Sequence, residues 1–283
     1  MPGRRLGSYR KGDWNEELGI LLLKSLAAIA SVPRQEDFGL DAVGTLLRPD
    51  QDNCVYAEDS FYVQLKSESA KQISYKDHEL DWLMNLQLPL FIGQVSRQDS
   101  LLRLFPAHVL NEFFVFRDFR NFKELIVKID DGGNAKRLAK GGRYEISLGK
   151  PLLTININQA SDSSFTEHAY QILKDYLRLE HRNINSRRLK FYRHIKWVPN
   201  KKVFSEGQIV ALRREYLKDD LFDACESIVP GIEVIRLYAE SEDKDLANKL
   251  SSLVEHLREF ITTPEPVGES ASIQWKDPFS FTS

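Results

Sequence analysis

The stretch that decides the fold runs from residue 37 to residue 66 and reads DFGLDAVGTLLRPDQDNCVYAEDSFYVQLK. Apolar and polar residues alternate over residues 37–47 and again over residues 54–66, whereas residues 49–53 are polar and favour a turn. Alternation with a period of two is typical of a strand that buries one face. The stretch therefore predicts a β-hairpin with a turn-rich tip.

Polar side chains on and before this hairpin are predicted to converge. Gln64 and Lys66 project from the same strand face, because side chains alternate along a strand, and the hairpin brings Asp41 beside them. Apolar residues recur at helical spacing over residues 14–29, so Glu17 lies on a helix that can reach the same edge. Two carboxylates, one amide and one ammonium group are thus expected in a small volume.

The choice of the helix carboxylate depends on a single position. Glu16 precedes Glu17, and a shift of one residue turns a helix position by about 100°. Glu17 is preferred, because Ile20 and Leu21 then continue its face into the core.

This combination of groups is suited to phosphodiester hydrolysis. Carboxylate and amide oxygens bind Mg²⁺, for which Mn²⁺ can substitute, and leave coordination positions for water and a phosphate oxygen. Asp41 is the expected central ligand, Gln64 a neutral carbonyl ligand and Glu17 an additional ligand. Lys66 is expected to orient or activate the water and to offset negative charge on the phosphate oxygens.

The residues that follow the hairpin complete an α/β pattern. Residues 78–88 have the spacing of a short helix, and the apolar run over residues 90–95 predicts a buried strand. The resulting order is helix, strand, strand, helix, strand, which favours an α/β domain.

Read in order, these motifs resemble a known superfamily. They are similar to a Mrr-like domain family of the PD-(D/E)XK, or restriction-endonuclease-like, nucleases. In chain order the motifs are Glu17, FGLD at residues 38–41, YVQLKS at residues 62–67, Tyr75-Lys76, a helix with Trp82, and PLFIG at residues 89–93. The resemblance covers about residues 10–120. It implies a mixed central sheet flanked by helices and a metal-dependent DNA endonuclease of prokaryotic anti-phage defence. The acidic position of the signature is commonly Gln in Mrr-type nucleases, so Gln64 is compatible with activity.

After residue 105 the pattern changes from strands to helices. Strands are expected over residues 113–116, 125–129 and 143–158, around a glycine- and lysine-rich loop over residues 132–142, and helices over residues 165–180, 206–228 and 243–261. The expected organisation is a nuclease-like domain over residues 10–120, a strand-rich extension over 121–160, and a mainly helical region over 161–283. The last region is expected to serve DNA binding, dimerisation or partner docking.

A basic segment supplies candidate contacts to nucleic acid. Residues 181–202 carry eight Lys or Arg and no acid, with aromatic residues between them, and this pattern is typical of surfaces that bind phosphates and stack bases. The candidate contacts are Lys76, Arg187, Arg188, Lys190, Arg193 and Lys196. The alternatives are that the aromatic rings pack inward while the Arg side chains extend to solvent, or that the segment faces the acidic residues 215–260.

Composition limits the remaining classes of function. The 283 residues are 42% hydrophobic and 28% charged, with a net charge of −2, as in a globular chain. We expect neither a signal peptide nor a membrane span, and the two cysteines support neither a disulfide framework nor a zinc site, so a cytoplasmic location is expected. Zinc-hydrolase, serine-hydrolase and ATP-binding motifs are absent from the sequence.

Two alternative functions stay open from the residues alone. One is a catalytically inactive nuclease-like module that binds DNA or protein, and the other is a nuclease effector activated by a separate sensor or ATPase subunit. The resemblance implies a possible homodimer, because cutting both strands of a duplex often uses paired active sites. The sequence fixes neither the oligomeric state, nor a DNA sequence preference, nor the choice of DNA over RNA.

Overall fold

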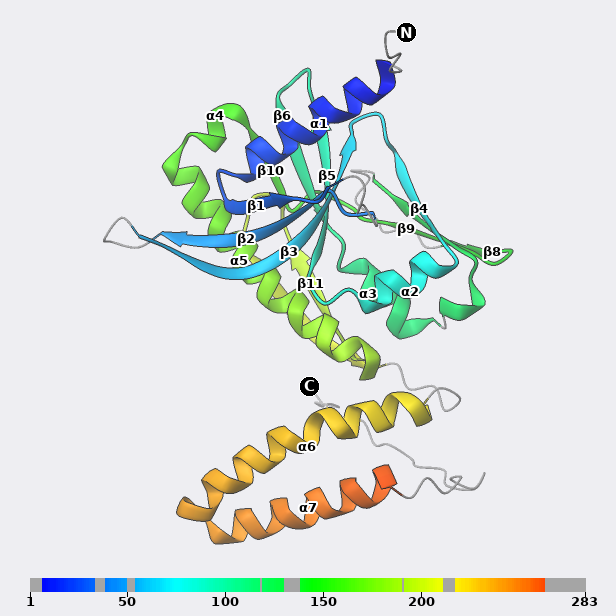
Figure 1. The fold of residues 1–283 in the computed structure, drawn as a ribbon, viewed down its shortest axis with the longest axis vertical. Helices are drawn as coiled ribbons and strands as arrows, with labels where there is room; N and C mark the ends of the chain where they lie inside the picture. The colour runs from blue at the N-terminus through cyan, green and yellow to red at the C-terminus, as the bar shows by residue number, and fades with distance from the viewer. Residues whose placement is uncertain are drawn as a thin grey trace, which may run out of the picture. The chain divides into compact units, whose positions relative to one another are not determined.

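The fold is described from a computed structural model (Figure 1). The structure describes residues 7–33, 39–49, 54–117, 119–129, 138–189, 191–210 and 217–262. The chain divides into two compact units, residues 1–212 and residues 213–283, which are described separately.

A mixed six-stranded sheet lies at the centre of the first unit. Its strands follow the order β1 (Ala27–Ser31), β2 (Ala42–Pro49), β3 (Val55–Ser67), β5 (Leu90–Ser96), β6 (Leu101–Pro106) and β10 (Leu153–Asn156). The neighbours β3 and β5 run parallel, and the other neighbouring pairs run antiparallel. Strands β2 and β3 therefore pair as the predicted hairpin requires, and its expected turn at residues 50–53 lies outside the described residues.

A second sheet covers part of the central one. Its order is β4 (Gln72–Lys76), β7 (Glu124–Lys128), β9 (Arg143–Ser147) and β8 (Leu138–Lys140), with β7 and β9 parallel. Strand β4 follows β3 directly and leads into helix α2 (His78–Asn85), while α3 (Val109–Phe116) and the short 3₁₀ helix η2 (Phe119–Asn121) lie between β6 and β7. This connection brings β4 and α2 close to the end of β3.

The two faces of the central sheet pack against different partners. One core joins Val63 and Leu65 of β3 to helices α1 (Gly7–Leu23) and α5 (Ser163–Ser186). On the other face, the core joins Ile92 of β5 and Phe105 of β6 to α2, α3 and the second sheet. Because side chains alternate along β3, Gln64 and Lys66 project to this second face.

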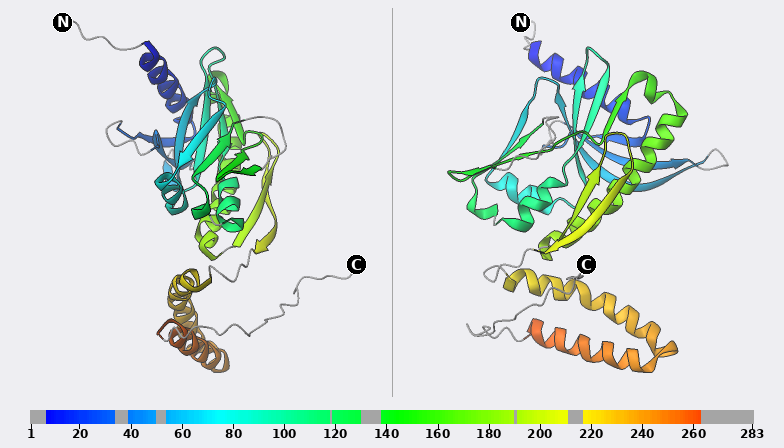
Figure 2. Two further views of the ribbon diagram at one scale, coloured as in Figure 1. Left: turned by 90° about the vertical axis from the view of Figure 1, so that its right-hand side faces the viewer. Right: turned by 180° about the vertical axis from the view of Figure 1, so that it is seen from behind.

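The remaining elements of the first unit adjoin helix α5. The short helix α4 (Ile157–Ala160) precedes it, and η3 (Arg187–Leu189) follows it. Strands β11 (Phe191–Trp197) and β12 (Val203–Val210) form an antiparallel ribbon that packs alongside α5 (Figure 2). Ile195 and Val203 of this ribbon belong to the core shared by α1 and α5.

The second unit is a helical hairpin. Helices α6 (Leu217–Glu242) and α7 (Lys244–Thr262) pack against each other through buried residues that include Ala239 and Val254. Several large apolar side chains of α6 are exposed, among them Val234 and Tyr238.

Three expected elements differ from the structure. The helix over residues 14–29 ends at Leu23, and residues 27–31 form strand β1 because they pair with β2. Residues 113–116 belong to helix α3 and not to a strand, since a short, fully apolar run does not distinguish the two. The expected helix over residues 206–228 begins as strand β12, which pairs with β11.

The boundaries expected at residues 120 and 160 do not coincide with the division of the chain. Helix α5 and the β11–β12 ribbon pack within the first unit, so that unit extends to residue 212. The coarser expectations are confirmed, because the chain is α/β with a mixed central sheet and ends its described part in helices.

Candidate functional site

Backbone pairing places Asp41 next to the strand that carries Gln64 and Lys66. Ala42 is in register with Val63, and the Asp41 N–H donates a hydrogen bond to the Val63 carbonyl at 2.9 Å. The Leu65 N–H in turn donates to Asp41 Oδ2 at 2.5 Å. The carboxylate is thus held against the middle of the Gln64–Lys66 segment, as the hairpin predicts.

Gln64 is fixed by a tyrosine from the next strand. Its side chain is 6% exposed, and its Oε1 accepts a hydrogen bond from the Tyr75 hydroxyl at 2.6 Å. Burial raises the pKa of Tyr75 well above its ordinary value, and the negative charges of Glu79 and Asp41 raise that pKa further. Asp41, Gln64 and Tyr75 therefore share one local environment.

A glycine turn leads the chain into this site. Gly39 has a φ of +97°, a backbone conformation that favours glycine. A Cβ atom at Gly39 would lie 3.6 Å from the Trp82 ring and 3.9 Å from Gln64 Nε2. Trp82 of α2 therefore adjoins the site, and its ring centroid lies 6.4 Å from that of Tyr75.

Lys66 shares the strand face of Gln64. It is half-buried and in register with Gln94 of the parallel strand β5. Lys66 and Gln64 thus lie on one strand face, and Asp41 is hydrogen-bonded to Leu65 between them.

Glu17 lies away from this group. Glu17 is exposed, on the same side of α1 as Leu21. Leu21 is itself 55% exposed, so this side of the helix does not continue into the core. The reason for preferring Glu17 over Glu16 therefore does not hold. Helix α1 packs on the face of β3 that carries Leu65, because a Cβ atom at Gly19 would lie 3.0 Å from the Leu65 side chain. Glu16 is half-buried on the side of α1 that packs on the sheet.

Two residues near the site carry no role in the sequence analysis. Tyr75 is one, and Glu79, in the first turn of α2, is the other. The Glu79 carboxylate accepts a hydrogen bond from the Lys76 N–H at 2.6 Å. In the sequence, the only sign of them is a tyrosine at an apolar strand position and an acidic first helical turn, directly after the Gln-x-Lys strand. The pairing of β4 shows where these two residues lie.

The donor chemistry of the site fits a hard divalent cation. Asp41 has a carboxylate, and Gln64 has an amide oxygen with two lone pairs, of which the Tyr75 hydroxyl uses one. Among the residues that the structure describes, no three His, Cys, Asp or Glu side chains gather as a metal site. A cation here would therefore rely on Asp41, the Gln64 oxygen, water and substrate.

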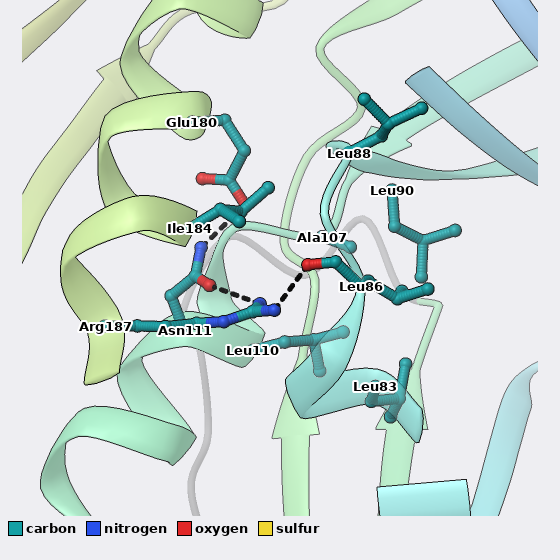
Figure 3. Close-up of a pocket in the computed structure, with 10 residues that line it drawn as sticks. All are labelled: Leu83, Leu86, Leu88, Leu90, Ala107, Leu110, Asn111, Glu180, Ile184 and Arg187. Atoms are coloured by element: carbon teal, nitrogen blue, oxygen red, sulfur yellow. Dashed lines mark hydrogen bonds between the residues drawn. The ribbon is translucent and has the colours of Figure 1, made fainter. Parts of the chain in front are cut away.

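Arg187 was expected to contact nucleic acid, and this expectation is wrong. The side chain is 5% exposed and donates to Asn111 Oδ1 at 3.1 Å and to the Leu86 carbonyl at 2.5 Å (Figure 3). It also donates to the Met84 carbonyl. These bonds connect the segment after α5 to the end of α2 and to α3. Arginine at the end of a helix satisfies carbonyl groups that lack partners within the helix.

A buried carboxylate belongs to the same network. Glu180 lines a small cavity with Arg187, Asn111 and apolar side chains, and it accepts a hydrogen bond from Asn111 at 2.6 Å (Figure 3). Burial raises the pKa of Glu180 to about 8, and the Asn111 bond and the Arg187 charge oppose this effect. The network is internal to the fold.

The other candidate nucleic-acid contacts are distributed over different elements. Lys76 and Lys196 are exposed, Arg188 is exposed and donates to Asn85 at 2.9 Å, and Arg193 is half-buried. The Lys76 Nζ lies 3.7 Å from a Glu124 carboxylate oxygen. Lys190 lies outside the described residues.

Comparisons of the chain with models of protein families, with curated proteins and with solved structures find no match. Across the described residues, no helix combines the length and the apolar composition needed to cross a membrane.

Proposed function

We propose that this chain is a metal-dependent DNA endonuclease of the restriction-endonuclease-like type, which uses Mg²⁺ or Mn²⁺. The observation that carries the proposal is the convergence of Asp41 and the Gln64 amide, with Lys66 on the same strand face. A mixed sheet with helices on both faces supports it, because this is the architecture that the motif resemblance implies.

Each residue has a distinct role in the proposed hydrolysis. Asp41 and Gln64 Oε1 hold the cation, and the Leu65 N–H keeps Asp41 in place. When bound, the cation polarises the phosphodiester and lowers the pKa of a water molecule. The Lys66 ammonium orients the attacking water, whose proton passes to solvent, and donates hydrogen bonds to the phosphate oxygens, where it offsets negative charge that develops in the transition state.

The proposal is tested by incubating purified protein with supercoiled and linear DNA in Mg²⁺, in Mn²⁺ and in EDTA. Wild-type protein is expected to nick or cut DNA in either metal and not in EDTA. Lys66→Ala is expected to lower the cleavage rate by about 100-fold or more, because it removes transition-state charge stabilisation, while DNA affinity changes little.

Lys128→Ala is the matched control. Lys128 is also a half-buried lysine on a strand, but it pairs with Glu145 in the second sheet. The cleavage rate of the Lys128→Ala protein should stay close to that of the wild type. Equal activity of Lys66→Ala and Lys128→Ala protein would contradict the assigned site.

The low exposure of Gln64 favours a second candidate function, in which the nuclease-like fold only binds DNA. This module would show DNA affinity that falls steeply as salt rises, because phosphate contacts release counterions. Binding of this kind, without cleavage in any metal, would support the module over the nuclease.

A further inference from the structure

The Tyr75 hydroxyl bonds one of the two candidate metal ligands, Gln64. It donates to Gln64 Oε1 at 2.6 Å, and the Asp41 charge acts on the same phenol. Tyr75 is 3% exposed, so its ring and hydroxyl lie within the core. The phenol is thus bonded to Gln64, and the Asp41 carboxylate is bonded to the N–H of the next residue, Leu65.

The position of this hydroxyl is set by packing on several sides. Tyr75 is in register with Leu125 of β7 and belongs to the core that joins α2 and α3 to the second sheet. Trp82 of α2 lies beside the ring. A buried aromatic side chain in such surroundings keeps one rotamer, so its hydroxyl is a fixed donor.

An amide ligand needs such a donor. The end of a Gln side chain has one oxygen, which binds cations, and one nitrogen, which does not. A half turn about the last side-chain bond exchanges the two atoms. A hydroxyl that donates to the oxygen selects one orientation, since the amide nitrogen carries hydrogens and is a poor acceptor.

We propose that Tyr75 is a positioning residue for the nuclease site, whose hydroxyl holds the Gln64 amide so that Oε1, and not Nε2, is available to a divalent cation on Asp41. The inference rests on the proposed function. Partners of metal ligands commonly act in this way, and their loss costs about 10- to 100-fold in metal affinity or activity.

The test measures Mn²⁺ binding to the full chain by calorimetry without DNA, and cleavage as a function of Mn²⁺ concentration. Tyr75→Phe is expected to weaken Mn²⁺ binding by about 10- to 100-fold. The half-saturating Mn²⁺ concentration for cleavage should rise by the same factor, whereas the rate at saturating Mn²⁺ should fall much less.

Tyr170→Phe is the matched control. Tyr170 is a buried tyrosine whose hydroxyl also donates a 2.6 Å hydrogen bond, in this case to Glu58 on the far part of β3. The substitution removes the same chemical group and a bond of the same length. It should leave Mn²⁺ affinity unchanged, so a general loss of stability is separated from a loss of positioning.

A second variant tests the orientation itself. A carboxylate has two equivalent oxygens and needs no donor to select one, so Tyr75→Phe should have little effect on Mn²⁺ affinity in a Gln64→Glu background. The coupling between the two substitutions is the expected signature of positioning.

The outcomes separate the two claims. If wild-type protein binds Mn²⁺ and cuts DNA but Tyr75→Phe binds Mn²⁺ equally well, the positioning role is overturned and the nuclease proposal stands. The positioning role is also overturned if Tyr75→Phe and Tyr170→Phe lose Mn²⁺ affinity equally. It is overturned as well if Tyr75→Phe lowers Mn²⁺ affinity by the same factor in the Gln64→Glu background as in the wild type. If the wild type neither binds Mn²⁺ nor cuts DNA, the proposed function itself fails.

Discussion

At the scale of single residues, surroundings distinguish carboxylates that look alike in the sequence. Asp41 is held by the Leu65 N–H and its charge raises the pKa of Tyr75, whereas Glu17 is exposed on α1. The helix packs on the face of β3 opposite to the one that carries Gln64 and Lys66. Only Asp41 of these two carboxylates therefore belongs to the described cluster.

A matched pair of carboxylate-to-amide substitutions tests this distinction. Asp41→Asn is expected to lower metal-dependent cleavage by about 100-fold or more, because it removes the charged cation ligand. Glu17→Gln should stay within about twofold of the wild type, as expected for an exposed residue without a role. Rates are measured on supercoiled DNA at saturating Mg²⁺, and a large loss in Glu17→Gln would restore Glu17 to the site.

At the scale of elements, one buried arginine joins parts of the chain that are distant in sequence. Arg187 follows α5, yet it bonds carbonyl groups at the end of α2 and the side chain of Asn111 in α3. Its guanidinium also lies near the buried Glu180 carboxyl. Arg187 therefore connects helices α5, α2 and α3, and its buried positive charge is not available to DNA.

Two adjacent arginines allow a controlled test of this role. Arg187→Ala is expected to lower the free energy of unfolding by several kcal/mol, because it leaves the buried carbonyl groups of Met84 and Leu86 and the Asn111 oxygen without their donor, at about 1–3 kcal/mol for each unsatisfied group. Arg188→Ala should cost less than about 1 kcal/mol, since Arg188 is exposed and donates a hydrogen bond to the exposed Asn85 side chain. Urea unfolding measures both values, and similar losses would contradict the assignment.

At the scale of the whole molecule, the first unit contains its own cores. Both apolar clusters consist of residues between Ile20 and Val203, and neither includes a residue of α6 or α7. The last core residues come from the β11–β12 ribbon. The residues that form the two cores therefore lie within residues 1–212.

Truncation tests this boundary. A chain of residues 1–212 is expected to unfold at the same urea concentration as the first unit of the full chain, because it keeps both apolar clusters of the described residues. A chain of residues 1–189 lacks Ile195 and Val203 and should lose several kcal/mol, since each buried side chain contributes about 1.5–3 kcal/mol. Circular dichroism during unfolding follows both, and an unfolded 1–212 chain would show that the boundary is wrong.

The sequence by itself determined the parts of this protein that depend on local pattern. Alternation over residues 37–66 predicted the central hairpin, and the period of two placed Gln64 and Lys66 on one face beside Asp41. The helix over residues 78–85 and the buried strand β5 also follow from spacing within a few residues. These features need no information about distant segments.

Only the tertiary structure decided the features that depend on pairing between distant segments. Residues 27–31 and 203–210 are strands because β2 and β11 pair with them, although their own spacing also suits helices. Tyr75 reaches Gln64 because β4 pairs with β7, and Arg187 is buried because α5 ends against α2 and α3. Periodicity fixes which side chains share a face, whereas long-range packing fixes what that face contacts.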